Sequence, residues 1–229
     1  MHPPVKIEFK NALSAGFLLV FSALFVATAV DQSLNKQIER VIQSPQGLSN
    51  IIWLWGALSM AASLLFPLII SLLCCHTLAR PTVPRLQFVK SKLELGLIET
   101  LRAWGMTFIW SFAFIIPGLI KYTYYLLTPF VVMFSTQYER GEVDALKLST
   151  EISKKFWWRL NFWLALFYFA LPIMISSVLD EYRVFRLHPV TATLCVLLET
   201  FILFIFHFIM LKLFIKYLHE IEVPNGTDV

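Results

Sequence analysis

Two polar side chains, a glutamate and a histidine, stand inside one of the most apolar stretches of the chain, residues 190–211. These side chains, Glu199 and His207, are of types that carry protons or bind cations. A carboxylate this deep in an apolar helix faces a helix bundle or a wet cavity, where it serves as a ligand or is held by a hydrogen bond. Eight residues separate the two, which places them about 80° apart around a helix. We therefore do not expect them to share a metal ion.

Other residues of the chemically active types form no recognisable site. Cys74, Cys75 and His76 are adjacent, so they point in different directions on a helix, and no second cluster completes a metal site. Cys195, like the other two cysteines, lies in an apolar stretch, so no disulfide framework is expected. Ser-His-Asp, H-E-x-x-H, P-loop and G-x-G-x-x-G arrangements do not occur. We expect no enzyme activity, cofactor or metal.

The composition excludes an ordinary soluble domain. Hydrophobic residues make up 58% of the 229 residues and charged residues 15%, against about 45–50% and 25% in soluble proteins. A helix needs about 20 mainly apolar residues to cross the hydrocarbon layer. The sequence therefore predicts an all-α polytopic membrane protein, a single membrane domain over residues 1–229. Its six transmembrane helices are expected over residues 12–30, 51–79, 103–120, 122–137, 160–179 and 190–211.

Basic residues predict the orientation of these helices. With six crossings and a cytoplasmic N-terminus, 14 of the 19 Lys and Arg residues lie inside and 5 outside, as the positive-inside rule requires. Residues 122–137 are the shortest segment and contain Pro129, but without this crossing the five basic residues of 140–159 would lie outside. Lys6, Lys10 and the run Ala27-Thr28-Ala29 also resemble a signal peptide, although the apolar stretch between them is long for one. We expect six crossings with both termini in the cytoplasm.

Two segments between the crossings have the periodicity of amphipathic helices. Apolar residues recur every three or four positions in 86–101 and again in 145–156. We expect cytoplasmic interfacial helices over about 86–101 and 144–157. Packing of these helices against the bundle explains the pattern equally well. Their basic residues are candidates for binding lipid headgroups: Lys90, Lys92, Lys147, Lys154 and Lys155.

A Pro-Gly pair marks a predicted turn between the third and fourth crossings. Proline removes a backbone donor and glycine tolerates left-handed backbone, so the helix that begins at Ala103 is expected to stop at Pro117 and Gly118. The chain then turns back through Lys121, whose ammonium group can reach the outer interface. Lys121 joins Glu199 and His207 as a candidate polar site within the membrane, although a tight hairpin explains these residues without a ligand.

The residues around this turn resemble a known group of proteins. The run from Trp110 to Tyr125 contains I-P-G-x-I-K-x-x-Y, and the run from Ala145 to Ser149 follows it. This pattern, over roughly residues 100–170, is similar to that of uncharacterised bacterial inner-membrane proteins. That group includes the YciC-like proteins and the membrane domain attached to some glycerophosphodiester phosphodiesterases. Its members commonly continue with an Asp-Asn-Pro-like turn, whereas residues 138–141 here read Tyr-Glu-Arg-Gly. The resemblance implies a multi-helix protein of the bacterial inner membrane and supplies no catalytic residue.

These observations predict a non-catalytic membrane protein that acts as a scaffold or accessory subunit of a membrane complex. Its expected partners are membrane lipids and either another protein or a second copy of the chain. Nucleic acid is not expected, because no basic stripe is interleaved with stacking aromatic residues. The alternative is a small secondary transporter or channel that uses Glu199. A weak similarity between residues 67–71 and 172–176, in matching places of two three-helix halves, favours that alternative.

Overall fold

The computed structural model describes residues 15–44, 50–79, 84–179 and 188–222, and within these ranges the chain forms helices and no strand. The predicted all-α class is confirmed. The first three residues of the predicted helix 12–30 lie outside the described ranges. The helices are α1 (Ala15–Ile42), α2 (Ile51–Ala79), α3 (Arg85–Ala113), α4 (Ile115–Tyr125), α5 (Thr128–Phe134), α6 (Thr136–Glu139), α7 (Ala145–Lys155), α8 (Trp157–Ala165), the π-helix η2 (Leu166–Ala170), α9 (Leu171–Leu179) and α10 (Pro189–Glu222).

Several of these helices are compatible with a multi-pass membrane protein. In the described part of the chain, four helical segments are long and apolar enough to cross a membrane: Gly16–Ile42, Ile51–Leu78, Ile115–Phe134 and Pro189–Glu222. The predicted count of six crossings is not confirmed. The predicted segment 160–179 is helical throughout, as α8, η2 and α9 follow one another without a gap. The π-turn directly precedes Pro172, whose missing N–H interrupts the α-helical pattern there.

The α3–α4 hairpin differs from the prediction. One unbroken helix, α3, replaces the separate interfacial helix 86–101 and the start of the crossing 103–120, because no Gly or Pro lies between residues 97 and 104. The chain turns at Phe114, which is extended at φ −160° and ψ 143°, and not at Pro117. Pro117 lies in the first turn of α4, where its missing N–H would have no helical partner in any case. The predicted helix end at Pro117 and Gly118 is therefore wrong.

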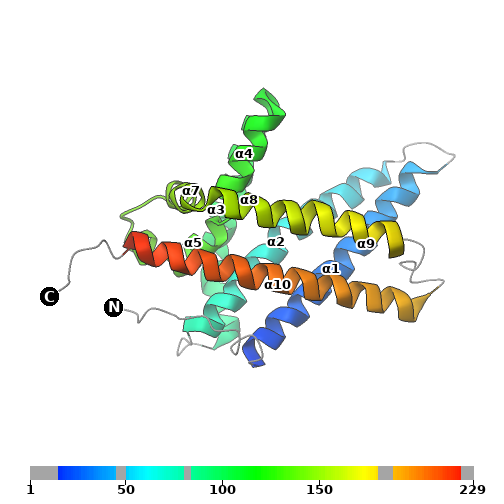
Figure 1. Ribbon diagram of the computed structural model, residues 1–229, viewed down its shortest axis with the longest axis horizontal. Helices are drawn as coiled ribbons and strands as arrows, with labels where there is room; N and C mark the ends of the chain where they lie inside the picture. Colours follow the sequence, from blue (N-terminus) through cyan, green and yellow to red (C-terminus); the bar gives the residue numbers. More distant parts are fainter. Residues whose placement is uncertain (1–14, 45–49, 80–83, 180–187, 223–229) are drawn as a thin grey trace.

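Gly118 allows the two helices of this hairpin to pack closely, and it does not form a left-handed turn. A Cβ atom on Gly118 would lie 2.7 Å from the Cα atom of Ser111 and 2.9 Å from its Cβ atom. The backbones of α3 and α4 therefore approach each other at this point as only a glycine permits. The end of α3 and the start of α4 run together and extend beyond the other helices (Figure 1).

The predicted crossing 122–137 is divided into three helices. A turn at Leu126 and Leu127 separates α4 from α5, and Ser135 separates α5 from α6. Pro129 begins α5 and breaks no helix, because it lies in the first turn. The predicted continuous helix is therefore replaced by short helices that pack against α2, α3 and α7.

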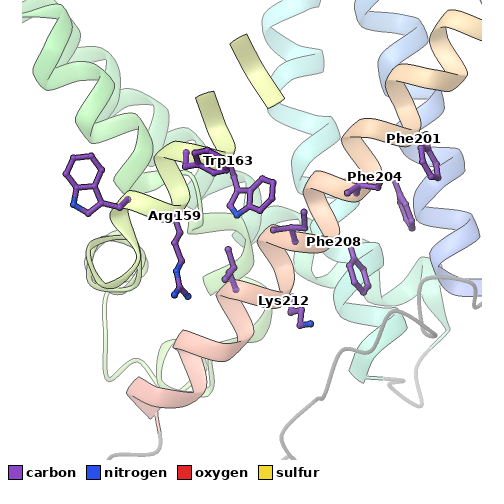
Figure 2. Close-up of a pocket in the computed structure, with 11 residues that line it drawn as sticks. Arg159, Trp163, Phe201, Phe204, Phe208 and Lys212 are labelled. Carbon is purple, nitrogen blue, oxygen red and sulfur yellow. The ribbon is translucent and has the colours of Figure 1, made fainter. Parts of the chain in front are cut away.

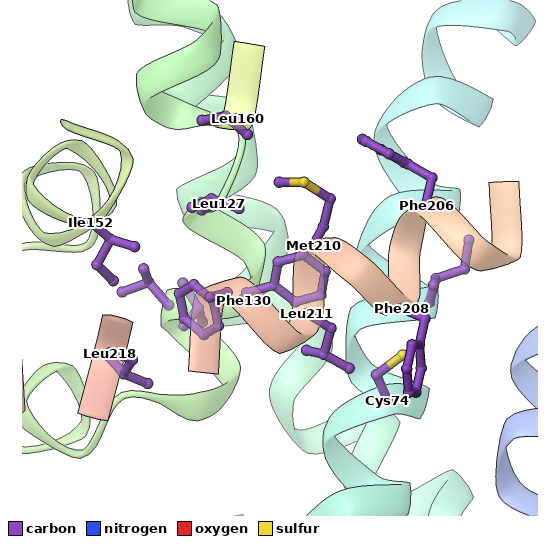
Figure 3. Close-up of a cluster of buried hydrophobic side chains, with 14 of the residues drawn as sticks. Cys74, Leu127, Phe130, Ile152, Leu160, Phe206, Phe208, Met210, Leu211 and Leu218 are labelled. Carbon is purple, nitrogen blue, oxygen red and sulfur yellow. The ribbon is translucent and has the colours of Figure 1, made fainter. Parts of the chain in front are cut away.

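Most of the well-packed interior lies toward one end of the molecule, which we call the packed end. It consists of the last turns of α2 and α10, the first turns of α3, the helices α5, α6 and α7, and the start of α8. Figure 3 shows buried side chains of α2, α5, α7, α8 and α10 converging there. The side chains that are at most 1% exposed there include Leu127, Val131, Ile152, Leu160, Leu211 and Phe214. α1 and α2 lie side by side, and α10 crosses α1 (Figure 1).

Amphipathic helix α7 occupies the second predicted interfacial segment and packs on the bundle. Its apolar side, with Ala145, Leu148 and Ile152, is buried against α4, α5 and α10. Asp144 caps its N-terminus by accepting hydrogen bonds from the amides of Leu146 (3.0 Å) and Lys147 (3.1 Å). Bundle packing thus explains the apolar periodicity of 145–156.

Charged and hydroxyl groups connect the elements of the packed end. Lys92 of α3 pairs with Glu139 of α6 at 2.6 Å, and Arg102 of α3 pairs with Asp144 at 2.5 Å. Partial burial raises the pKa of Asp144, but the hydrogen bond from Arg102 and those from the α7 amides outweigh it and lower the pKa. The carboxylate of Glu222, at the end of α10, accepts hydrogen bonds at the start of α6: from Ser135 Oγ (2.6 Å), Thr136 Oγ1 (2.9 Å) and the Gln137 amide (3.3 Å).

A tyrosine–glutamate contact adds to this network. The hydroxyl of Tyr138 donates to Glu99 Oε1 at 3.2 Å. Burial and the neighbouring Glu99 charge raise the pKa of Tyr138 to about 12. The first half of α3 is therefore fixed to α6 and to the start of α7, so residues 90 and 150 lie at the same end of the molecule.

Candidate functional site

Glu199 connects two long helices. It lies half-buried on α10, and its Oε2 accepts a hydrogen bond from Nε2 of Gln32 on α1. The sequence did not indicate Gln32, because the predicted crossing ended at residue 30, whereas α1 continues to Ile42. The carboxylate is thus held by a neighbouring helix, which is one of the two roles that the sequence left open.

His207 faces a different part of the molecule from Glu199. It lines a small cavity of about 150 Å³ between α2, α3, α4, α5 and α10, and Glu199 is not among the lining residues. Its Nδ1 lies 3.1 Å from the carbonyl oxygen of Leu203. Hydroxyl groups of the lining already donate to carbonyls of their own helices: Ser71 to Pro67, Thr100 to Gly96 and Thr107 to Ala103. The structure does not bring Glu199 and His207 together.

Lys121 lies apart from both of these residues. Its Nζ is 5.1 Å from the ring centroid of Trp110 on α3 and 5.7 Å from that of Tyr125 on α4. Such cation–π contacts stabilise an ammonium group away from bulk water. Lys121 therefore joins the arms of the α3–α4 hairpin, and the three candidates for an intramembrane polar site occupy three separate places.

The five candidate headgroup-binding lysines fall into two groups. Lys92 is bound to Glu139, so it serves the fold. Lys90, Lys147, Lys154 and Lys155 are exposed. Lys154 Nζ lies 5.8 Å from the ring centroid of Tyr124. These four remain available to an anionic partner.

The described residues offer no metal site. No group of three His, Cys, Asp or Glu side chains lies close enough in them to hold a metal ion. Cys74 and Cys75 are buried free thiols, and Cys75 Sγ lies 3.0 Å from the carbonyl oxygen of Met133. Cys75 therefore contributes to the packing of α2 on α5.

A second hollow, a groove between α8 and α10, was not indicated by the sequence. Its volume is about 1040 Å³. Figure 2 shows aromatic side chains along its walls and two cations, Arg159 on α8 and Lys212 on α10. The lining residues are Trp158, Arg159, Phe162, Trp163, Phe201, Phe204, Ile205, Phe208, Ile209, Lys212 and Leu213. The available signals were the Trp-Trp-Arg run at 157–159 and the Phe-rich stretch at 201–208, but their pairing depends on how α8 lies against α10.

Comparisons with known proteins give no relative: no family model, no curated protein and no solved structure matches the chain. The resemblance of residues 100–170 to the YciC-like group therefore stays a prediction. Any functional conclusion depends on the geometry of the groove and of the charged groups around it.

Proposed function

We propose that this protein is a non-catalytic, multi-pass membrane protein that acts as a scaffold or accessory subunit and binds anionic lipid headgroups at its packed end. The observation that supports this proposal is a set of basic side chains on α7, α8 and α10 that form no ion pair with a carboxylate of the described residues. The set consists of Lys147, Lys154, Lys155, Arg159 and Lys212, which are all exposed.

At the packed end, several acidic side chains are bonded within the fold, whereas the five basic residues of the set form no ion pair with other described residues. The ion pairs of the described residues involve the basic groups of Lys36, Lys92, Arg102 and Arg140, and none of the five set members. Several acids of the same end are occupied by internal bonds: Glu99, Glu139, Asp144 and Glu222. Each basic residue near an anionic leaflet contributes about 1 kcal/mol to binding.

The topology that fits this role places the packed end in the cytoplasm of a bacterial cell, with both termini on that side of the inner membrane. The uncharged arm of α3, residues 103–113, is about 16 Å long, roughly half of the ~30 Å hydrocarbon layer. We infer that the α3–α4 hairpin enters from the cytoplasm and turns near the middle of the membrane, in place of the predicted third and fourth crossings. The full crossings are then α1, α2, α8 to α9, and α10.

The turn residue Phe114 has both of its backbone polar groups paired. Non-helical backbone within a membrane must have its polar groups satisfied. The Phe114 amide donates to the Trp110 carbonyl at 3.1 Å, and the Phe114 carbonyl accepts from the Gly118 amide at 3.2 Å. Pro117 has no N–H to satisfy. The side chain of Ile115, at the tip, is 84% exposed, as a lipid contact requires.

Single cysteines test this topology in a variant whose three natural cysteines are replaced by alanine. Cysteines at Lys90 and Lys147 are expected to react with a membrane-impermeant maleimide from the cytoplasmic side only, and a cysteine at Ala113 from neither side. Asn50→Cys, between α1 and α2, is the control that reacts from outside. Outside labelling at Ala113 would show a full crossing, and labelling of positions 90 and 147 from opposite sides would overturn the topology.

Charge removal on α7 tests the binding of headgroups. The triple variant Lys147→Gln, Lys154→Gln, Lys155→Gln is expected to lower the ratio of anionic to zwitterionic lipid retained by the purified protein about 100-fold, because three attractive charges are lost. Native mass spectrometry of protein extracted from mixed-lipid vesicles measures this ratio. Lys36→Gln is the control, because Lys36 lies near the C-terminal end of α1, away from the packed end (Figure 1). An unchanged ratio in the triple variant would contradict headgroup binding by α7.

Ion flux separates the scaffold proposal from transport. If Glu199 only connects α10 to α1, Glu199→Gln changes no flux into proteoliposomes. A proton- or ion-dependent flux that this variant abolishes while the fold stays intact would replace the scaffold role by that of a transporter.

A further inference from the structure

Two pairs of aromatic rings hold α10 against the facing segment that includes α8. Phe156 stacks on Tyr217, with centroids 4.9 Å apart and planes 6° from parallel. Phe167 of the π-helix contacts Phe206 at 5.1 Å. The residues of α10 that line the groove run from Phe201 to Leu213, so this wall is about 18 Å long. That length is close to the depth of one leaflet of a ~30 Å hydrocarbon layer.

Contacts between aromatic rings hold the apolar walls of the groove. The rings of Phe204 and Phe208 pack edge-on against Phe17 of α1, at 6.5 and 6.1 Å. On the opposite wall Trp163 contacts Phe162 at 5.4 Å and Phe167 at 5.8 Å. Because neighbouring rings already hold these side chains, an apolar ligand loses little free energy in ordering them.

Both cations of the groove lie toward the end that is nearer the Phe156–Tyr217 pair. Figure 2 shows Lys212 at the opposite end of the α10 wall from Phe201, and Arg159 on the facing helix. Among the described residues, no Asp or Glu lines the groove. An Arg guanidinium binds phosphate oxygens in a bidentate manner, and a Lys adds a point charge. Trp158, which is 80% exposed, has the amphipathic ring that settles at headgroup depth.

We propose that this groove binds one anionic glycerophospholipid of the cytoplasmic leaflet. The phosphate lies between Arg159 and Lys212, and an acyl chain runs along the wall formed by Trp163, Phe204 and Phe208. A cationic end and an apolar trough of one-leaflet depth match the two parts of such a lipid. A neutral lipid or an apolar helix would leave both cations without a counter-charge. This inference deepens the proposed function and rests on its assignment of the packed end to the cytoplasmic side.

Two groove variants test the proposal in the full-length protein purified in detergent. Native mass spectrometry follows titration with phosphatidylglycerol or with phosphatidylcholine of the same acyl chains. The wild type is expected to retain one phosphatidylglycerol per chain in preference to phosphatidylcholine. Arg159→Gln with Lys212→Gln is expected to weaken phosphatidylglycerol binding about 10- to 30-fold and to leave phosphatidylcholine unchanged. Ile209→Trp, which fills the trough and keeps both cations, is expected to weaken both lipids.

The remaining outcomes distinguish this proposal from the previous one. The α7 triple-lysine variant and Lys36→Gln serve as comparisons, and thermal unfolding confirms that each variant is folded. Loss of binding in the α7 variant but not in Arg159→Gln with Lys212→Gln would overturn the groove and leave the proposed function standing. If Arg159→Gln with Lys212→Gln lost phosphatidylglycerol binding but Ile209→Trp did not, the lipid would bind only through its headgroup at the surface. That result would also contradict binding in the groove. Conversion of a dimer to a monomer by Ile209→Trp would assign the groove to a second copy. Unchanged binding in all variants would overturn both proposals.

Discussion

Gly118→Ala is expected to push α4 off α3 and to destabilise the protein by about 3 kcal/mol. The added Cβ atom would lie 2.7 Å from the Cα atom of Ser111, and a backbone atom cannot move aside as the end of a side chain can. The single-residue turn at Phe114 allows little adjustment, because both of its backbone polar groups are already bonded. The two helices must therefore separate along the hairpin, and the cation–π contact of Lys121 with Trp110 is lost as they do.

A neighbouring glycine provides a matched control for this variant. Gly105 lies on α3 in the same hairpin, and nothing lies within 4 Å of the position that its Cβ would take. Gly105→Ala should therefore stabilise the helix by up to about 1 kcal/mol through its higher helix propensity. Thermal unfolding in a fixed detergent, followed by circular dichroism, compares the two variants. Equal midpoints for Gly118→Ala and Gly105→Ala would show that α3 and α4 do not pack closely at Ser111.

The sequence predicted apolar helices better than it predicted where helices end. The structure gives α2 the bounds of the predicted segment 51–79, and α10 begins one residue before the predicted 190. α10 continues to Glu222, however, because Lys212 and Lys216 are exposed and a charge on an exposed face does not end a helix. The same reason explains why α1 passes Asp31 and reaches Ile42. An apolar run indicates the part of a helix that lipid can surround, and the helix itself extends further.

The position of the turn in the α3–α4 hairpin could not be predicted from the sequence. Pro117 and Gly118 correctly indicated that the chain turns in this region. The turn itself lies at Phe114, a residue without any turn preference. A proline is compatible both with the position after a helix and with the first turn of the next one. Only the close approach of Gly118 to Ser111 decides between them, and that approach is a tertiary contact.

The candidate sites were predictable only where one helix carries them. The exposure of Lys147, Lys154 and Lys155 follows from the amphipathic pattern of α7 alone. The groove depends on the register between α8 and α10. Arg159 and Lys212 lie 53 residues apart in sequence, so no local pattern indicates that they line the same groove. Likewise, Glu199 was identified as a buried acid, but its partner Gln32 lies 167 residues away.

Phe214→Ala is expected to destabilise the protein by about 3–5 kcal/mol, the range for truncating a fully buried aromatic side chain. Phe214 is 0% exposed, and its ring lies 5.6 Å from that of Phe130 and 6.1 Å from that of Phe134, both on α5. Within an apolar surrounding the loss comes mainly from the contacts that the cavity lining no longer makes. Phe201→Ala is the matched control, because Phe201 lies on the same helix and is 54% exposed; its truncation should cost less than about 1 kcal/mol.

The position of Phe214 also connects the packed end to the groove. Lys212 and Leu213 line the groove, and the next residue, Phe214, packs on α5, so one turn of α10 serves both. Phe214→Ala is therefore expected to weaken retention of phosphatidylglycerol as well, although Phe214 does not line the groove, because Lys212 loses its fixed place opposite Arg159. Chemical unfolding in mixed detergent measures the stability of each variant, and native mass spectrometry measures the retained lipid. If Phe214→Ala lowered stability no more than Phe201→Ala does, the contact between α10 and α5 would not be what stabilises the packed end.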